Sequence, residues 1–282
     1  MSQVRLESAL PAAWDIAALD EIADGIGGRV FRAALRSGGT AIVKQLSALA
    51  LRDRADGEAF LRWRDGRGAV RLLDRQGDLL LLEDAGDRTL LDLFRRDGDE
   101  AATAVAAELI RVLHASGAGR LPAGLDTLDA CFSSLFARAA MGGRGRDAEH
   151  YRTAAALAER LLAGQRGIRP LHGDFHHENA LHSPRGWLAI DPKGVLGDPA
   201  FDVANLFYNP LESELRYDPA RAARLAFGLA PTVDRKPAEL LDWAFAFTAL
   251  SASWHAEDGN LDEAAKSLRV GRAVATARER VA

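Results

Sequence analysis

The chain has 282 residues, of which 48% are hydrophobic and 27% charged, a composition that predicts a folded protein with a sizeable core and excludes a disordered chain. Its net charge of −4 argues against nucleic acid as a partner, because phosphate neutralisation needs a basic surface, and favours a small, cationic substrate. The single cysteine, Cys131, excludes an internal disulfide framework and fits a reducing compartment, although a buried, inert thiol fits as well.

The N-terminal stretch MSQVRLESALPAAWD carries charges too early for a signal peptide, and no run of about 18 apolar residues occurs in the chain. A cytoplasmic protein with no membrane partner, either a monomer or a homodimer, is therefore expected. Arginine is the usual cation of this sequence, because only four of its 36 basic residues are lysines. A lysine at an unusual position, such as Lys44 or Lys193, is thus informative.

Residues 22–82 predict an antiparallel sheet. Gly38-Gly39 separates two strand-like runs and residues 74–78 separate two more, as hairpin turns do. Residues 47–63 interrupt the sheet with Leu49, Leu51, Phe60 and Leu61 among charged residues, a mixture that predicts a helix.

After Thr89 the chain becomes rich in alanine and leucine with helical periodicity, which predicts helices at 100–116, 126–141, 148–164, 218–230, 237–255 and 261–280. Asp198-Pro199 before AFDVANLF predicts a further helix start. Two apolar runs, 180–182 and 187–190, flank Ser-Pro-Arg-Gly and predict a small hairpin. The expected fold class is α+β with two lobes, a small β-rich lobe over residues 1–86 and a larger α-helical lobe over residues 87–282.

The richest polar motif, HGDFHHENA, begins at His172 on the loop before this hairpin. Asp174 and Asn179 are five residues apart, and Asp191 follows the second strand, so the folded hairpin returns Asp191 beside Asn179. Their oxygens suit Mg²⁺, which prefers a few protein oxygens plus water and substrate phosphates. Asp174 is then free to accept a proton from a hydroxyl nucleophile. Phosphoryl transfer requires this division of labour.

The segments LHGDFHHENAL and LAIDPKG resemble the catalytic and metal loops of the aminoglycoside phosphotransferases, relatives of the protein kinases. The longer string GWLAIDPKGVLGDPAFDVANLFYNP most resembles the streptomycin kinase and hydroxyurea-resistance kinase branch. The resemblance covers most of the chain and implies a protein-kinase-like fold that uses ATP, or another nucleoside triphosphate, with Mg²⁺. It implies that Asp174 is the catalytic base, that Asn179 and Asp191 hold the metal, that His172 braces the loop and that Asp202 reaches the loop backbone.

The resemblance also implies phosphate-binding and nucleotide-binding residues in the first lobe. Lys44, in the run AIVKQL, is the candidate for the α- and β-phosphates, and Glu58, 14 residues later, is the carboxylate expected to hold it. In GIGGRV, Gly27 and Gly28 are candidates for a loop that covers the nucleotide. Main-chain groups near Glu83 and Ala85 are candidates for contact with the adenine edge. An outward-facing surface lysine and a glycine turn without a ligand are the alternatives.

The acceptor is expected between the catalytic loop and the C-terminal helices, where acidic and aromatic side chains suit an amino or guanidino sugar of the streptomycin type. The candidates are His176, Glu178, Glu212, Trp254, His255, Glu257 and Asp258, with Glu214 of the same rank as Glu212. Solvated acids and a core tryptophan are the alternative interpretation. A choline-, homoserine- or sugar-like metabolite is the alternative acceptor.

Two other function classes stay open from the sequence. His176, His177 and His182 near Asp174 allow a binuclear metallohydrolase, although the order His-x-Asp-x-His-His differs from the metallo-β-lactamase pattern His-x-His-x-Asp-His. A kinase-like fold that binds without catalysis is the third class, and the intact base, metal and lysine positions argue against it.

Overall fold

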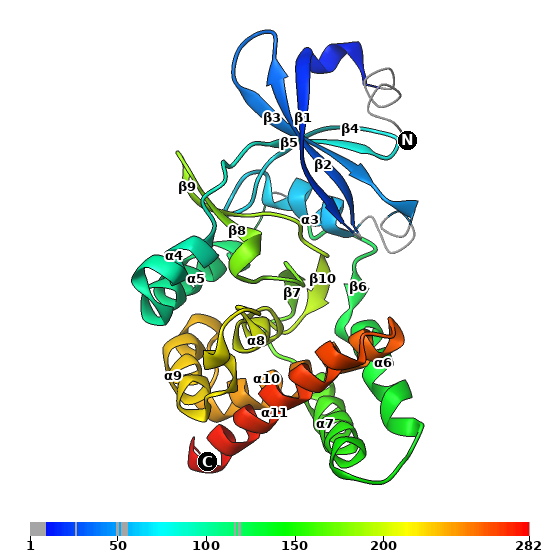
Figure 1. Cartoon of the computed structure of the whole chain (residues 1–282), viewed down its shortest axis with the longest axis vertical. Coiled ribbons are helices and arrows are strands. Elements are labelled where there is room, and N and C mark those ends of the chain that lie inside the picture. The colour runs from blue at the N-terminus through cyan, green and yellow to red at the C-terminus, as the bar shows by residue number, and fades with distance from the viewer. Residues whose placement is uncertain are drawn as a thin grey trace.

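The chain folds into an antiparallel sheet at one end and a larger helical part at the other (Figure 1). This computed structural model describes residues 10–25, 27–48, 51, 56–115, 117 and 120–281. The stretch that was considered as a signal peptide, residues 1–15, lies mostly outside the described residues. The predicted α+β class, with strands in the N-terminal part and helices in the C-terminal part, is confirmed.

The N-terminal sheet has five strands in the order β1-β2-β3-β5-β4, and every neighbouring pair is antiparallel, as predicted. The strands are β1 (Ile16–Gly25), β2 (Gly28–Leu35), β3 (Thr40–Leu46), β4 (Leu72–Gln76) and β5 (Leu79–Glu83). The sheet begins earlier than residue 22 because β1 is an edge strand on which only Leu19 is buried. Such a strand lacks the apolar alternation that reveals a strand in sequence.

Helix α3 (Asp56–Arg64) lies between the sheet and the helical part and confirms the second half of the helix predicted over 47–63 (Figure 1). The earlier half, including Leu49, falls largely outside the described residues. Phe60 and Trp63 pack into the hydrophobic core of the C-terminal part. The N-terminal turn of the helix lies against Pro192, because a Cβ added to Gly57 would be 2.1 Å from the Pro192 carbonyl oxygen.

The C-terminal part is mainly helical, and its helices surround a core to which most of them contribute (Figure 1). They are α4 (Leu90–Asp97), α5 (Asp99–His114), α6 (Leu128–Ala140), α7 (Arg146–Ala163), α8 (Ala200–Tyr208), α9 (Pro219–Leu229), α10 (Pro237–Glu257) and α11 (Leu261–Val281). All except α4 match a predicted helix. Helix α4 has only 8 residues, too few for a clear periodic pattern, and the capping box of Thr89 and Asp92 fixes its start.

Two small sheets carry the polar motif. The predicted hairpin is present as β8 (Ala180–Ser183) and β9 (Gly186–Ala189), and β6 (Asp126–Thr127), β10 (Val195–Gly197) and β7 (Arg169–Leu171) form a sheet that was not predicted. The hairpin also joins the two parts of the molecule, because Val70 N–H donates to the Ala189 carbonyl at 3.0 Å and Ala189 N–H to the Gly68 carbonyl at 2.8 Å. The polar loops at its base are therefore held against both parts.

The hydrophobic side chains form two clusters. A small one fills one face of the sheet around Phe31, Val43 and Trp14, and a large one runs through the helical part. Since α3 contributes to the large cluster, the packing does not divide at residue 86, and the lobe boundary placed there stays a prediction. No helix in the described part of the chain combines the length and apolar character that crossing a bilayer requires.

Candidate functional site

The loop from His172 to Asn179 connects β7 to β8, and buried side chains fix its backbone. The Asp202 carboxylate accepts hydrogen bonds from His172 N–H at 2.9 Å, from Gly173 N–H at 2.7 Å and from His114 Nε2 at 2.9 Å. Burial alone raises the pKa of Asp202, but these donors and nearby imidazoles hold it below its ordinary value, so the group is a carboxylate. Asp202 therefore lies where the resemblance expects a support for the loop.

The buried His172 ring joins this loop to the end of β9. Its Nε2 donates to the Ile190 carbonyl at 2.8 Å, and its Nδ1 accepts from Asp174 N–H at 3.2 Å. Burial lowers the pKa of His172, which keeps the imidazole neutral and able to accept and donate at once. The ring thus ties the residue before Asp191 to the backbone of Asp174.

The side chain of Asp174 is held at both oxygens. Oδ1 accepts from the Asn205 amide at 3.1 Å, and Oδ2 lies 3.6 Å from the Lys193 ammonium. Burial, the largest influence, raises the pKa of Asp174, but nearby positive charge, above all that of Lys193, outweighs it and lowers the pKa overall. The carboxylate is therefore ionised near neutral pH and points in a defined direction.

A chain of buried amides and a guanidinium supports this orientation. The Asn205 Oδ1 accepts from Asn209 Nδ2 at 2.9 Å, and the Asn209 carbonyl accepts from Arg221 Nη2 at 2.9 Å. Arg221 is in turn paired with Asp99 on α5. Sequence analysis missed Asn205 and Asn209. Their positions in the AFDVANLFYN segment, three and seven residues after Asp202, were the only signal available.

Asn179 and Asp191 lie at the base of the hairpin, just beyond the last paired residues, Ala180 and Ala189. Ile190 N–H donates to the Asn179 carbonyl at 3.0 Å, which places Asp191 one residue beyond that pair. The Asn179 Nδ2 donates to the Asp174 carbonyl at 2.9 Å, so its oxygen is the group left for a cation. Asp191 has a left-handed backbone with φ 54°, and its carboxylate is 58% exposed and contacts the Lys44 ammonium.

This oxygen pair fits Mg²⁺ better than a metal with an all-protein cage. In the described ranges, no three His, Cys, Asp or Glu side chains come close enough to enclose an ion. One amide oxygen and one exposed carboxylate leave the remaining positions to water and phosphates, which is how Mg²⁺ is commonly bound. That Asp191 attracts the Lys44 ammonium agrees with a site for positive charge.

The expected pairing of Lys44 with Glu58 is wrong in this structure. Glu58 accepts from Arg62 at 2.9 Å and also pairs with Arg75 on β4, whereas Lys44 reaches across to Asp191. Within the described residues Lys44 and Glu58 form no ion pair with each other. The spacing along the chain was right for a strand and a helix, but two arginines compete for the Glu58 carboxylate.

The glycine turn between β1 and β2 lies close to Lys44. A Cβ added to Gly27 would be 3.6 Å from the Lys44 Nζ, and one added to Gly28, whose φ is 123°, would be 1.9 Å from the Gln45 carbonyl oxygen. Any side chain at Gly28 would therefore collide with β3. Gly27 and Gly28 thus lie against Lys44 and β3.

The segment that leaves β5 is fixed by charge pairs. Glu83 N–H donates to the Arg71 carbonyl at 2.9 Å, and the Glu83 carboxylate accepts two hydrogen bonds, at 2.8 and 2.6 Å, from Arg185 at the tip of the β8–β9 hairpin. Of the main-chain groups near Glu83 and Ala85 that were expected at the adenine edge, the Glu83 N–H is thus engaged within the protein. Ala85 is buried two residues further on.

The acceptor candidates fall into two groups. Trp254 and His255 lie near the polar loops, because the Lys193 Nζ is 5.0 Å from the Trp254 ring centroid and the His255 Nε2 is 3.4 Å from the hydroxyl of Tyr208 on α8. His176 caps the short turn that contains Glu178, and the Glu178 side chain is exposed.

The remaining candidates are largely bound to other side chains. Glu212 accepts two hydrogen bonds from Arg95, at 2.8 and 2.5 Å, and Glu257 accepts one from Ser134 at 2.8 Å. Glu214 is paired with Arg269 at 3.6 Å, and Asp258 is exposed beyond the end of α10. The carboxylates of Glu212, Glu214 and Glu257 therefore already have partners within the protein.

The histidine cluster does not converge as a metallohydrolase site requires. His177 is buried against Phe94 with a centroid distance of 5.7 Å, and burial lowers its pKa to about 3. His182 accepts from Arg88 at 2.6 Å and packs on Trp187. The imidazoles of these two histidines face different surroundings, which argues against a shared metal.

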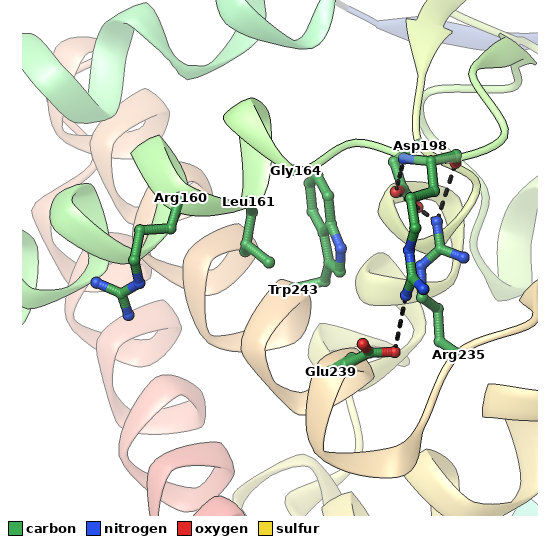
Figure 2. Close-up of a pocket in the computed structure, with 8 residues that line it drawn as sticks. Arg160, Leu161, Gly164, Asp198, Arg235, Glu239 and Trp243 are labelled. Atoms are coloured by element: carbon green, nitrogen blue, oxygen red, sulfur yellow. Dashed lines mark hydrogen bonds and ion pairs between the residues drawn. The ribbon is translucent and has the colours of Figure 1, made fainter.

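A cavity of about 130 Å³ opens elsewhere, where the end of α7 meets the start of α10 (Figure 2). Its lining residues are Arg160, Leu161, Gly164, Arg166, Asp198, Arg235, Glu239 and Trp243. Asp198 accepts from Arg235 at 2.5 Å, and also from the backbone of Arg166 and Ala200. The buried pair anchors the start of α8, and its donors and acceptors are already satisfied within the protein.

Comparison with protein-family models matches residues 13–259 to the family described as aminoglycoside/hydroxyurea antibiotic resistance kinase. The streptomycin 3''-kinase of Klebsiella pneumoniae is 43% identical over 169 residues, which are 57% of this chain and 60% of that protein. The hydroxyurea phosphotransferase of Kitasatospora aureofaciens is 35% identical over 181 residues, 61% of this chain and 49% of that protein. The matched segments thus span about half the length of these curated relatives.

Solved structures share the fold at low sequence identity. A choline/ethanolamine kinase family protein from Mesorhizobium loti aligns with a TM-score of 0.66 at 16% identity, over 98% of each chain. An amicoumacin kinase, solved in complex with AMP-PNP, Ca²⁺ and Ami, aligns with a TM-score of 0.61 at 12% identity, over 97% of this chain and 96% of that one.

Proposed function

We propose that this chain, which belongs to the aminoglycoside/hydroxyurea antibiotic resistance kinase family, transfers the γ-phosphoryl group of ATP to a hydroxyl group of a small molecule. The observation that carries this proposal is the arrangement of Asp174. Its ionised carboxylate is fixed by Asn205 and lies on the same loop as Asn179, which pairs with the residue before Asp191. A base beside two oxygen ligands is what phosphoryl transfer to an alcohol needs.

In the proposed reaction, Asp174 Oδ2 accepts the proton of the acceptor hydroxyl while the hydroxyl oxygen forms a bond to the γ-phosphorus. The bond from the γ-phosphorus to the bridging oxygen breaks, and its electron pair leaves with ADP. Because the pKa of Asp174 is low, the carboxylate orients the hydroxyl and takes its proton late, when the new bond has made that proton acidic.

Asn179 and Asp191 would hold Mg²⁺, and Lys44 would contact the nucleotide phosphates from β3. When bound, the metal ion supplies positive charge to the phosphate oxygens. The Lys44 ammonium contacts the Asp191 carboxylate and also lies beside Gly27, so Lys44 and the metal would share that carboxylate. The nucleotide bound in the related amicoumacin kinase structure supports ATP as the donor.

The favoured acceptor is streptomycin or a similar aminocyclitol. Its support is the 43% identity to a streptomycin kinase over more than half of this chain. The exposed carboxylate of Glu178, next to Asn179, offers a cationic acceptor a charge-assisted hydrogen bond. Hydroxyurea and hydroxylated metabolites of the choline, homoserine or sugar type are the acceptors to compare.

The test is to measure ADP release by the purified protein with ATP and Mg²⁺ against streptomycin, other aminoglycosides, hydroxyurea, choline and homoserine, with mass spectrometry of the product. Asp174→Asn should lower turnover about 10³-fold and leave ATP affinity within about threefold, because the base acts on the acceptor. The matched control is Asp234→Asn, at an exposed residue with a left-handed φ of 53°, which asparagine tolerates. A protein that phosphorylates no hydroxyl compound would refute the proposed function, and full turnover in Asp174→Asn would refute the base.

A further inference from the structure

Lys193 places a positive charge at the carboxylate of Asp174. Its Nζ lies 3.6 Å from Asp174 Oδ2, the oxygen that Asn205 leaves free. The backbone of Lys193 is fixed, because both Lys193 N–H and Gly194 N–H donate to the His172 carbonyl, at 2.8 and 3.1 Å. The lysine is therefore part of a rigid loop packed on the catalytic loop.

A second group holds the ammonium on one side of this carboxylate. The Trp254 ring centroid is 5.0 Å from the Lys193 Nζ, within the range of a cation–π contact. Trp254 lies in the last turn of α10 and packs edge-on against Phe247, with a centroid distance of 6.3 Å. The ring thus keeps the ammonium towards the C-terminal helices, where the acceptor is expected.

The two lysines of the site divide between its two carboxylates. Lys44 contacts Asp191 from β3, on the side of the nucleotide, and Lys193 contacts Asp174 on the side of the acceptor. The catalytic loop HGDFHHENA itself contains no lysine or arginine. A phosphoryl group that moves from the nucleotide to an oxygen beside Asp174 therefore leaves Lys44 and approaches Lys193.

We propose that Lys193 is a catalytic residue whose ammonium binds the phosphoryl group as it reaches the acceptor oxygen, with Trp254 as its positioning residue. The inference rests on the proposed function. The ammonium keeps its three protons and forms no covalent bond. It offsets the charge on the phosphoryl oxygens while the hydroxyl proton passes to Asp174 and the bond to ADP breaks. Its side chain is 56% exposed, so the head group can turn from Oδ2 to the phosphoryl oxygens.

In this arrangement the Trp254 ring contacts the ammonium of Lys193 and not a cation of the acceptor. A cationic acceptor would then place its positive groups away from this ring, at Glu178 on the opposite end of the catalytic loop. The charge on Lys193 would repel a guanidino or amino group near the reacting hydroxyl.

The test compares Lys193→Met and Lys193→Arg with Lys236→Met, a control at the exposed residue before α10. Lys193→Met should lower kcat about 10²-fold with KM for ATP within about threefold, because the interaction forms only during transfer. Lys193→Arg keeps the charge and should recover at least a tenth of the wild-type kcat. Trp254→Leu should lower kcat about tenfold, and Trp254→Phe, which keeps an aromatic face, should restore most of it.

A binding measurement tests the role of Lys193 without an acceptor. With Mg²⁺ present, Lys193→Met should weaken binding of ADP with aluminium fluoride, which mimics the phosphoryl group in transfer, about 10²-fold and leave ADP binding unchanged. Equal affinities of wild type and Lys193→Met for the fluoride complex, or an equal loss for ADP alone, would overturn the inference in favour of a structural ion pair. A wild-type protein that binds nucleotide but phosphorylates no acceptor would refute the proposed function alone, and the fluoride comparison would still decide the role of Lys193.

Discussion

The amide of Asn205 is the contact on which the orientation of Asp174 depends most directly. In Asn205→Ala the carboxylate loses the 3.1 Å hydrogen bond at Oδ1 and keeps Lys193, at 3.6 Å, as its nearest side-chain cation. The hydrogen bond from the Asn209 side-chain Nδ2 to the backbone carbonyl of residue 205, at 3.1 Å, survives the substitution. The change therefore removes an orienting group without breaking the local helix end.

The magnitude follows from the charge on the acceptor of this hydrogen bond. A hydrogen bond to an ionised group contributes about 1.5–3 kcal/mol. At about 1.4 kcal/mol for each factor of ten, its loss lowers the fraction of correctly oriented carboxylate, and with it kcat, about 10- to 100-fold. Asn209→Ala, one step further along the chain of hydrogen bonds, should lower kcat by a smaller factor, about threefold.

The assay is initial-rate ADP release at saturating ATP and acceptor, with ATP affinity and thermal unfolding measured on the same samples. Asn260→Ala is the matched control, because Asn260 also bonds through its side chain, to Glu263 N–H at 3.3 Å, but lies before α11. A kcat within twofold of wild type in a folded Asn205→Ala protein would show that other contacts orient Asp174. A change confined to KM would show the same.

Three further predictions follow from other parts of the structure. Gly57→Ala should cost about 1–3 kcal/mol of stability and weaken nucleotide binding, because its Cβ would be 2.1 Å from the Pro192 carbonyl oxygen; Gly228→Ala, a helical glycine with its nearest neighbour at 3.9 Å, should be neutral or stabilising in the same urea titration. Asp191→Ala should weaken Mg²⁺-dependent ATP binding at least tenfold in calorimetry, and unchanged binding would remove Asp191 from the metal site. Burial lowers the pKa of His177 from 6.5 to about 3. Between these two pH values the His177 imidazole is therefore protonated in the unfolded chain and neutral in the folded chain. The free energy of unfolding should therefore fall as pH drops from 6.5 towards 3, and a His177→Leu protein with the same pH dependence of Tm would contradict this assignment.

The sequence determined the parts of the molecule that depend on neighbouring residues. Helical periodicity located six of the helices α4–α11, Asp198-Pro199 marked the start of a seventh, and turn residues located the hairpins of the sheet. The return of Asp191 to the base of the hairpin, beside Asn179, also followed from the sequence, because the register of a short hairpin is set by its own turn. The motif residues of the site were therefore identifiable before the fold was known.

Tertiary packing decided which of those residues meet across long stretches of chain. Lys44 and Asp191 are 147 residues apart, and their contact depends on how the sheet packs on the helical part. Asn205 reaches Asp174 across 31 residues from another helix, and Trp254 reaches Lys193 from α10. Glu58 had the expected spacing, yet competition from Arg62 and Arg75 gave it other partners. Spacing along the chain specifies local geometry, whereas partners brought together by packing depend on every element between them.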